Sequence, residues 1–271
     1  MKNKCINLIK EYTGHPHGAF MPSGDAAVYT SMYICKKQNP KGFFLIPDEG
    51  GWFSYEKYPK MFGFEIIRIK TKDGMIDLED LQKHIPKASG FIYQNPGGYY
   101  AKQFIRQIYD ICKNKCLCIL DVSGSISDKE LCDGNYADMT ICSFGRWKTV
   151  DLKYGGALTS KFDLRQFNDF LRMMKVNFDY DKLYNKLSNA GNRLKKLDAV
   201  CNKIKNDLRE MDIAHPEQKS LVVVAKFKDS KEKEKIIKYC KDNNYEYKEC
   251  PSYIRINDKA ISIEIKRLDL E

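Results

Sequence analysis

The chain has 271 residues, enough for one large domain or for a large domain with a smaller one. Its 43% hydrophobic and 12% aromatic residues can bury a substantial core, which excludes a largely disordered protein, and no apolar run reaches the ~20 residues that span a bilayer. The net charge of +10 comes mostly from dispersed lysines, and arginine is sparse, so we expect neither nucleic-acid nor membrane binding.

The first 160 residues alternate between helical patterns and short apolar runs. In chain order they predict a helix over 1–12, a loop rich in His, Pro and Gly, a helix over 24–37, a strand over 43–47, a helix over 54–62, a strand over 65–69, a helix over 77–85, a strand over 90–94, a helix over 102–113, and strands over 116–122, 139–144 and 155–160. Strands separated by helices, several of them apolar throughout, indicate an α/β fold with a mostly parallel central sheet that is covered by helices on both faces.

The composition changes after Ser160. Residues 162–211 are charged and helical in pattern, and they are followed by a strand over 220–225, a helix over 231–243, and strands over 253–256 and 260–265. We therefore predict three parts: a large domain over 1–160, a long helical connector over 161–218 and a small α+β domain over 219–271.

Ten cysteines in a chain without a signal peptide predict reduced thiols and a cytoplasmic protein. Cys112, Cys116 and Cys118 lie close together, but their spacing matches no common zinc or iron–sulfur pattern. Because Cys116-Leu-Cys-Ile-Leu resembles the start of a buried strand, where cysteine acts as a small hydrophobe, we expect no metal there.

Four features lie at helix or strand ends, where ligands gather in parallel sheets. The first is the turn Ser23-Gly24-Asp25, which opens a helix; the free N–H groups and dipole of a helix N-terminus suit a phosphate. The second is Trp52, which follows a glycine-rich segment and either stacks on a flat heterocycle or fills the core.

The third feature is Asp121 at the end of a strand. A carboxylate there can pair with a pyridine nitrogen and make the ring an electron sink, or it can simply cap a helix. The fourth is Ser143-Phe-Gly-Arg-Trp-Lys148, in which Ser143 and Arg146 suit a phosphate. A lysine in a partly dry pocket has a lowered pKa and can form an imine; the alternative is a surface lysine.

Taken together, these features resemble the fold-type-I pyridoxal phosphate (PLP) enzymes, most nearly the DegT/DnrJ/EryC1/StrS aminotransferase family. That family has Ser-Gly-Thr-Ala-Ala, a stacking aromatic after a Pro-ended strand, a strand-end Asp, and Ser-Phe-x-x-x-Lys followed by Gly-Gly. The matching positions are Ser23-Gly24, Ala26-Ala27, Trp52, Asp121, Ser143-Phe144, Lys148 and Gly155-Gly156. The resemblance covers residues 12–160 well and the remainder loosely, and it implies an aspartate-aminotransferase-like large domain with a small C-terminal domain.

The resemblance also implies roles. Lys148 would form the internal aldimine and act as general base, Asp121 would pair with the pyridine nitrogen, and Trp52 would stack on the ring. The phosphate would be held by Ser23, Gly24, Asp25 and Ser143, and Asn95 of the Asn95-Pro-Gly-Gly turn would face the ring hydroxyl.

Some positions depart from the family pattern. Asp25 replaces the usual Thr, Gly124 stands where Gln or His commonly follows the Asp, and Gly145 replaces a frequent His. The chain is also shorter than typical members, which puts a family-based substrate assignment in doubt.

The implied function is a PLP-dependent aminotransferase that moves an amino group from an amino-acid donor to a keto acceptor, such as a keto sugar, and that works as a homodimer on small molecules. Arg255 and Arg267 are candidates for binding the donor carboxylate, and His15 and His17 either reach the site or are ordinary loop residues. Two alternatives stay open: lyase, dehydratase or desulfurase chemistry with the same cofactor, although no loop cysteine suited to a desulfurase is evident, and a catalytically reduced regulatory protein with the PLP fold.

Overall fold

A seven-stranded sheet forms the larger part of the molecule. The structure, a computed structural model, describes residues 1–270. The strands lie in the order β1-β9-β8-β7-β6-β2-β3. Their bounds are β1 His17–Met21, β2 Phe43–Pro47, β3 Glu65–Ile69, β6 Ala88–Gln94, β7 Leu117–Asp121, β8 Met139–Ser143 and β9 Gly156–Ser160. Neighbours from β8 to β3 are parallel, whereas β9 runs antiparallel to both β8 and β1. The predicted mostly parallel sheet is confirmed.

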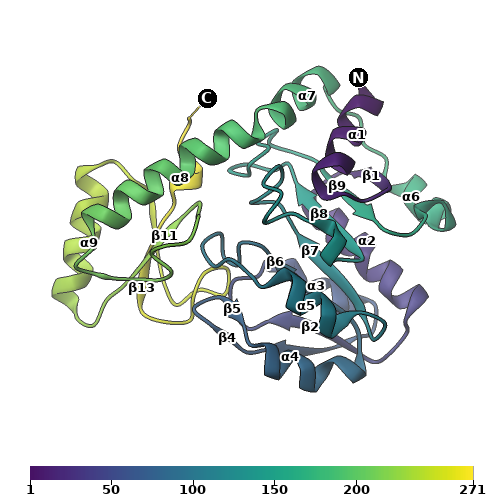
Figure 1. Ribbon diagram of the computed structural model, residues 1–271, viewed down its shortest axis with the longest axis horizontal. Coiled ribbons are helices and arrows are strands. Elements are labelled where there is room, and N and C mark those ends of the chain that lie inside the picture. Colours follow the sequence, from purple (N-terminus) through teal and green to yellow (C-terminus); the bar gives the residue numbers. More distant parts are fainter. Residues whose placement is uncertain (271) are drawn as a thin grey trace.

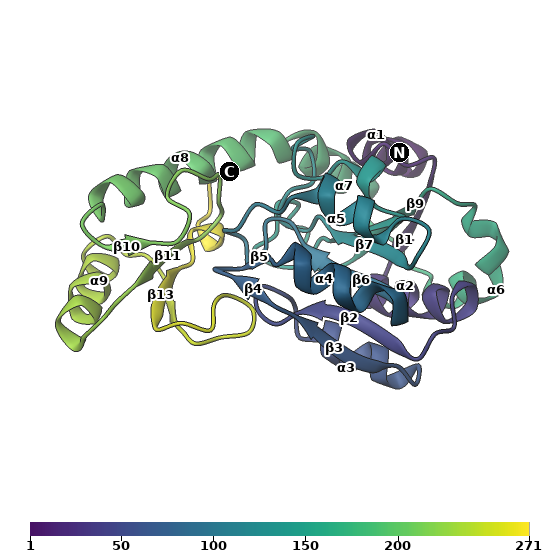
Figure 2. The same ribbon diagram turned by 60° about the horizontal axis from the view of Figure 1, so that its bottom comes forward.

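Helices cover both faces of this sheet (Figure 1, Figure 2). One face is covered by α1 Lys2–Thr13, α4 Leu78–His84, α5 Ile105–Cys112 and α7 Tyr180–Ser188, and the other by α2 Gly24–Gln38, α3 Ser54–Met61 and the short α6 Asn168–Leu171. Alternate side chains of a strand fill opposite cores: Phe91 and Tyr93 of β6 pack on the first face and Ile92 on the second. The central strands β6, β7 and β8 are therefore almost fully buried, because neither face of the sheet reaches water there.

A smaller unit follows the long helix α8 Ala190–Asp207, which runs from the large sheet to the small one (Figure 1). Its antiparallel sheet has the order β10-β11-β13-β12, with β10 Asp212–Ile213, β11 Val223–Lys226, β12 Tyr247–Glu249 and β13 Ala260–Ile263, and α9 Ser230–Asp242 packs on β13. The core of this unit includes Leu197 and Ile204 of α8 and, from the large sheet, the turn residues Tyr99 and Tyr100. The turn after β6 thus joins the two cores.

Two predicted segments are wrong, and a third is helical but divided. The segment rich in His, Pro and Gly is not all loop, because residues 17–21 form the edge strand β1, whose pairing with β9 outweighs its turn-like composition. Residues 162–211 are mostly helical, as their pattern predicts, and consist of short 3₁₀ turns, α6, α7 and α8. Residues 253–256 are not a strand, since Ser252 N donates to Ile256 O and closes a turn; β12 and the two-residue β10 complete the small sheet instead.

The hairpin of β4 Thr71–Lys72 and β5 Met75–Ile76 was also not predicted. The division at residues 160 and 218 stays a prediction, since α7 packs on the large core while the later turns of α8 pack on the small one. None of the helices in residues 1–270 has both the length and the apolar character needed to cross a bilayer.

Candidate functional site

A cavity of about 270 Å³ opens at the carboxyl ends of the parallel strands. Seven of the eight predicted site residues line it: Ser23, Gly24, Asp25, Trp52, Asp121, Ser143 and Lys148. The cavity is also lined by residues that the sequence did not single out, among them Tyr99, Ser123 and Lys266. Residues from widely separated stretches of the chain therefore meet in one place.

The N-terminus of α2 forms one wall. Ser23 caps this helix, because its Oγ accepts a hydrogen bond from Ala26 N at 3.0 Å. The helix approaches the end of β8 closely: a Cβ on Gly24 would lie 2.7 Å from Ser143 Oγ, so only glycine fits there. The backbone end of α2 and the Ser143 hydroxyl thus share one corner, which suits a phosphate group.

The Asp25 carboxylate contacts the side chain of Trp52. Its Oδ1 accepts a hydrogen bond from Trp52 Nε1 at 3.0 Å. The contact orients the indole beside the cavity.

Asp121 ends β7 and is nearly buried, with 7% of its surface exposed. Its Oδ2 accepts from the Tyr55 hydroxyl at 2.6 Å, and its Oδ1 accepts from Ser123 N at 2.8 Å. Burial, and then the Asp121 charge, raise the pKa of Tyr55 well above its usual value, so Tyr55 remains a neutral donor. In residues 1–270 no cation forms an ion pair with Asp121, and its remaining lone pairs are available to a group in the cavity.

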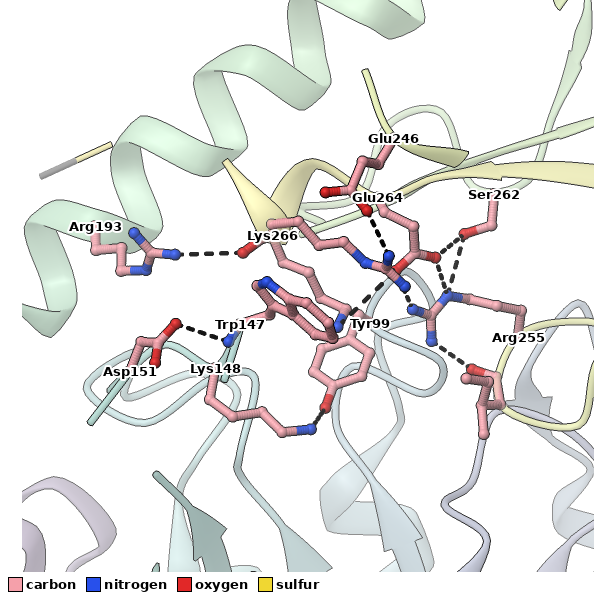
Figure 3. A network of polar contacts seen from close by, with 12 residues as sticks. Tyr99, Trp147, Lys148, Asp151, Arg193, Glu246, Arg255, Ser262, Glu264 and Lys266 are labelled. Atoms are coloured by element: carbon pink, nitrogen blue, oxygen red, sulfur yellow. Dashed lines mark hydrogen bonds and ion pairs between the residues drawn. The ribbon is translucent and has the colours of Figure 1, made fainter. Parts of the chain in front are cut away.

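The Lys148 amine donates a hydrogen bond to the Tyr99 hydroxyl (Figure 3). Its Nζ lies 4.6 Å from the centroid of the Trp52 ring and 4.9 Å from that of Tyr99. Burial alone would lower the pKa of Lys148, but Tyr99 and then Asp121 outweigh burial, and the pKa is raised. The predicted lowering of the Lys148 pKa is therefore wrong for the protein without its cofactor. The amine carries a proton that it must lose before it can act as a nucleophile.

The C-terminal unit places two cations near Tyr99. The Arg255 guanidinium lies 5.3 Å and the Lys266 amine 4.7 Å from the Tyr99 ring centroid, and Figure 3 shows both on the side away from Lys148. Arg255 is buried and donates to both Glu264 oxygens, at 2.9 and 2.6 Å. Arg267 pairs with Glu246 at 2.6 Å. Neither predicted carboxylate-binding arginine lines the cavity; Lys266 does.

Asn95 also lies outside the cavity lining. Its amide donates to Leu131 O at 2.8 Å, and its side-chain oxygen accepts from Gln103 N at 2.9 Å. The side chain is fully buried, so it braces the turn that carries Tyr99.

The two histidines near the α2 turn do not reach the cavity. His17 lies on β1, 3.9 Å from Asp163. His15 is buried, with its ring nitrogens 2.8 Å from Thr159 Oγ1 and 2.8 Å from Gly134 O. Both contribute to the fold rather than to the cavity.

His15 is expected to make the protein sensitive to acid. Burial lowers its pKa, so as pH falls through about 6.5 the unfolded chain gains a proton that the folded chain does not, and stability is lost in that window. Urea unfolding at neutral pH and at about pH 5.5 should show a smaller loss for His15→Gln than for the wild type. A His84→Gln variant, altered on the half-buried surface of α4, should behave like the wild type; an equal loss in all three would contradict the assignment.

The cavity residues fit pyridoxal phosphate, since a helix N-terminus, a carboxylate, an indole and an amine line the same space. Within the described part of the chain, no group of three or more His, Cys, Asp or Glu side chains is arranged to hold a metal ion. Cys112, Cys116 and Cys118 are buried in the core.

Comparison with known proteins identifies the fold. The chain is similar to a serine palmitoyltransferase variant from S. paucimobilis with a bound PLP–myriocin aldimine (TM-score 0.71, 11% identity, covering 99% of this chain and 72% of that one). It is also similar to L-threonine transaldolase from Pseudomonas fluorescens in the internal aldimine state (0.73, 15%, 98% and 66%) and to alanine–glyoxylate aminotransferase from Nostoc sp. (0.70, 12%, 97% and 80%). The fold is aspartate-aminotransferase-like.

A match to a known family by sequence covers only the C-terminal part of the chain. Residues 191–271 match the family described as MJ1341 family C-terminal domain, which covers most of α8 and the small sheet. No curated protein matches the sequence. The predicted fold is thus confirmed, and the narrower resemblance to the DegT/DnrJ/EryC1/StrS family stays a prediction.

Proposed function

We propose that this protein is a PLP-dependent enzyme whose cofactor is attached to Lys148. One observation carries the proposal: the Lys148 amine, the Trp52 ring and the Asp121 carboxylate, which are far apart in the sequence, line a single cavity. Solved structures that share the fold contain PLP, which supports the same cofactor here.

Each residue has a distinct task toward the cofactor. Ser23, Gly24 and Ser143 would bind the phosphate, and Trp52, oriented by Asp25, would lie against the ring. Asp121 would accept a hydrogen bond from the pyridinium nitrogen, with Tyr55 and Ser123 holding the carboxylate in place. When bound, PLP supplies an aldehyde that condenses with amines and a ring that delocalises charge from the substrate Cα.

Proton movement falls to Lys148. Its hydrogen bond to the Tyr99 hydroxyl holds the amine at the cavity wall. The freed amine can then take a proton from the substrate Cα and return it. Tyr99 is therefore the residue that most directly controls the protonation of Lys148.

We infer aminotransferase chemistry, with an amino-acid donor and a keto acceptor, as the preferred reaction. The desulfurase alternative is less favoured, because all ten cysteines are buried. A homodimer is proposed from the family resemblance, and a cytoplasmic location from the ten cysteines, which predict reduced thiols. Lyase or dehydratase chemistry needs the same residues and is distinguished by its products.

The cofactor assignment is tested by absorbance. Wild-type protein mixed with PLP should develop the visible absorbance of covalently attached cofactor, and Lys148→Ala should not; Lys129→Ala, which alters an exposed lysine, should match the wild type. Because the pKa of Lys148 is raised, the attachment rate should increase with pH. After borohydride reduction, peptide mapping should place the label on Lys148. A colourless wild type, or a label elsewhere, would refute the proposal.

The reaction type is tested by products. With glutamate and no acceptor, an aminotransferase should release about one 2-oxo acid per site and no ammonia, since the amino group stays on the enzyme. Continuous release of ammonia would instead identify elimination.

A further inference from the structure

Lys266 is a buried amine for which residues 1–270 provide no hydrogen-bond acceptor. It follows β13, only 6% of its surface is exposed, and it lines the same cavity as Lys148. Its nearest carboxylate oxygen, Glu264 Oε2, is 3.9 Å away, beyond hydrogen-bond distance. Such an amine has donors to offer a ligand.

Glu264 is already used by other donors. Arg255 binds both of its oxygens, and the Ser262 hydroxyl donates to Oε1 at 2.9 Å. The Lys266 amine contacts aromatic faces instead, at 4.7 Å from the Tyr99 centroid and 5.9 Å from that of Trp147 (Figure 3). Glu264 thus lies near both Arg255 and Lys266, but of these two only Arg255 is within hydrogen-bond distance of it.

We propose that Lys266 binds the carboxylate of the amino-acid ligand in this cavity. The inference rests on the proposed function, because it assumes a ligand that reacts beside Lys148. It differs from the sequence-based expectation, in which Arg255 or Arg267 would bind this group. Both arginines are held by glutamates, whereas Lys266 lines the cavity with no acceptor among the described residues.

Binding of the carboxylate should be accompanied by uptake of a proton by Lys266. Burial, and then the charges of Arg255 and Lys148, lower the pKa of Lys266 well below its usual value; Glu264 opposes this and Arg267 adds to it. Before the ligand arrives, the amine therefore loses its proton more readily than an exposed lysine does. An entering carboxylate supplies the opposite charge that stabilises the ammonium, so anion and proton bind together.

Calorimetry of PLP-loaded protein with glutarate tests the proposal. Glutarate carries carboxylates but no amine, so it binds without reacting. At about pH 8.5, titrations in two buffers of different ionisation enthalpy should show uptake of about one proton per glutarate. Lys266→Met should weaken binding by about 10- to 100-fold, the loss of one charge-assisted hydrogen bond, and abolish the uptake.

Two further variants make the result specific. Lys266→Arg should bind glutarate without proton uptake, because arginine is always protonated. Lys241→Met, on the exposed face of α9, should match the wild type. Normal binding and uptake in Lys266→Met, uptake that persists in Lys266→Arg, or uptake driven by inorganic phosphate and not by glutarate would overturn the assignment. Visible absorbance before titration shows that PLP is attached, so failure here is distinct from failure of the cofactor proposal.

Discussion

Replacing Asp121 with asparagine is expected to slow the reaction with an amino-acid donor by about 10²- to 10³-fold, the usual effect of removing a preorganised electrostatic partner. In the proposed enzyme, Asp121 keeps the pyridine nitrogen protonated and so stabilises negative charge that develops on the ring. An amide has the same shape and still accepts one hydrogen bond from Tyr55 or Ser123, but it has no charge. PLP should still attach to Lys148.

The measurement is the single-turnover rate with glutamate, followed by absorbance. Asp25→Asn serves as the matched control, since it removes a charge from the same cavity at a residue that contacts Trp52 rather than the ring nitrogen. It should reduce the rate far less. Equal effects of the two substitutions would argue that the cavity needs only a net negative charge and that Asp121 has no specific partner.

The sequence was sufficient to predict most of the large sheet. Strands such as β2 and β3 were predicted at their observed residues, because an apolar run that ends at Pro47 and an isoleucine-rich stretch that follows Gly63 leave few alternatives. The edge strand β1 was missed because its pattern depends on pairing with β9, more than 130 residues later. Residues 253–256 were predicted as a strand because three of the four are aromatic or aliphatic. They instead form a turn in which Arg255 is buried.

Among the cavity residues, too, some could be predicted from the sequence and others could not. Residues at the ends of strands and helices could be predicted, since the topology of a parallel sheet brings Asp121, Ser143 and the α2 turn to one edge. Tyr99, Tyr55 and Lys266 could not, because their roles depend on side-chain directions and on how the C-terminal unit packs against the turn after β6. Arg255 was a reasonable candidate for binding a carboxylate because of its residue type. Only the fold shows that Glu264 already pairs with it.

Glu264 is expected to be the carboxylate whose loss most weakens the C-terminal unit. It is fully buried and binds Arg255 through both oxygens, so Glu264→Gln leaves a buried guanidinium without its counter-charge. Breaking a buried pair in this way typically costs about 3–5 kcal/mol. Glu246→Gln alters a pair whose carboxylate is 61% exposed, and should cost at most about 1 kcal/mol.

Urea unfolding compares the free energies of unfolding of Glu264→Gln and Glu246→Gln. The double variant Arg255→Met/Glu264→Met shows how much of the lost stability comes from the unpaired guanidinium, because removing both partners should restore part of it. Burial would raise the pKa of Glu264, but Arg255 and then Lys266 outweigh it and lower the pKa. The stabilisation is therefore present above the ordinary glutamate pKa of about 4.3 and is lost as pH falls through the lower folded value. If Glu264→Gln and Glu246→Gln unfold at the same urea concentration, Glu264 does not compensate the buried cations, and the argument that Lys266 is left free to bind a ligand loses its basis.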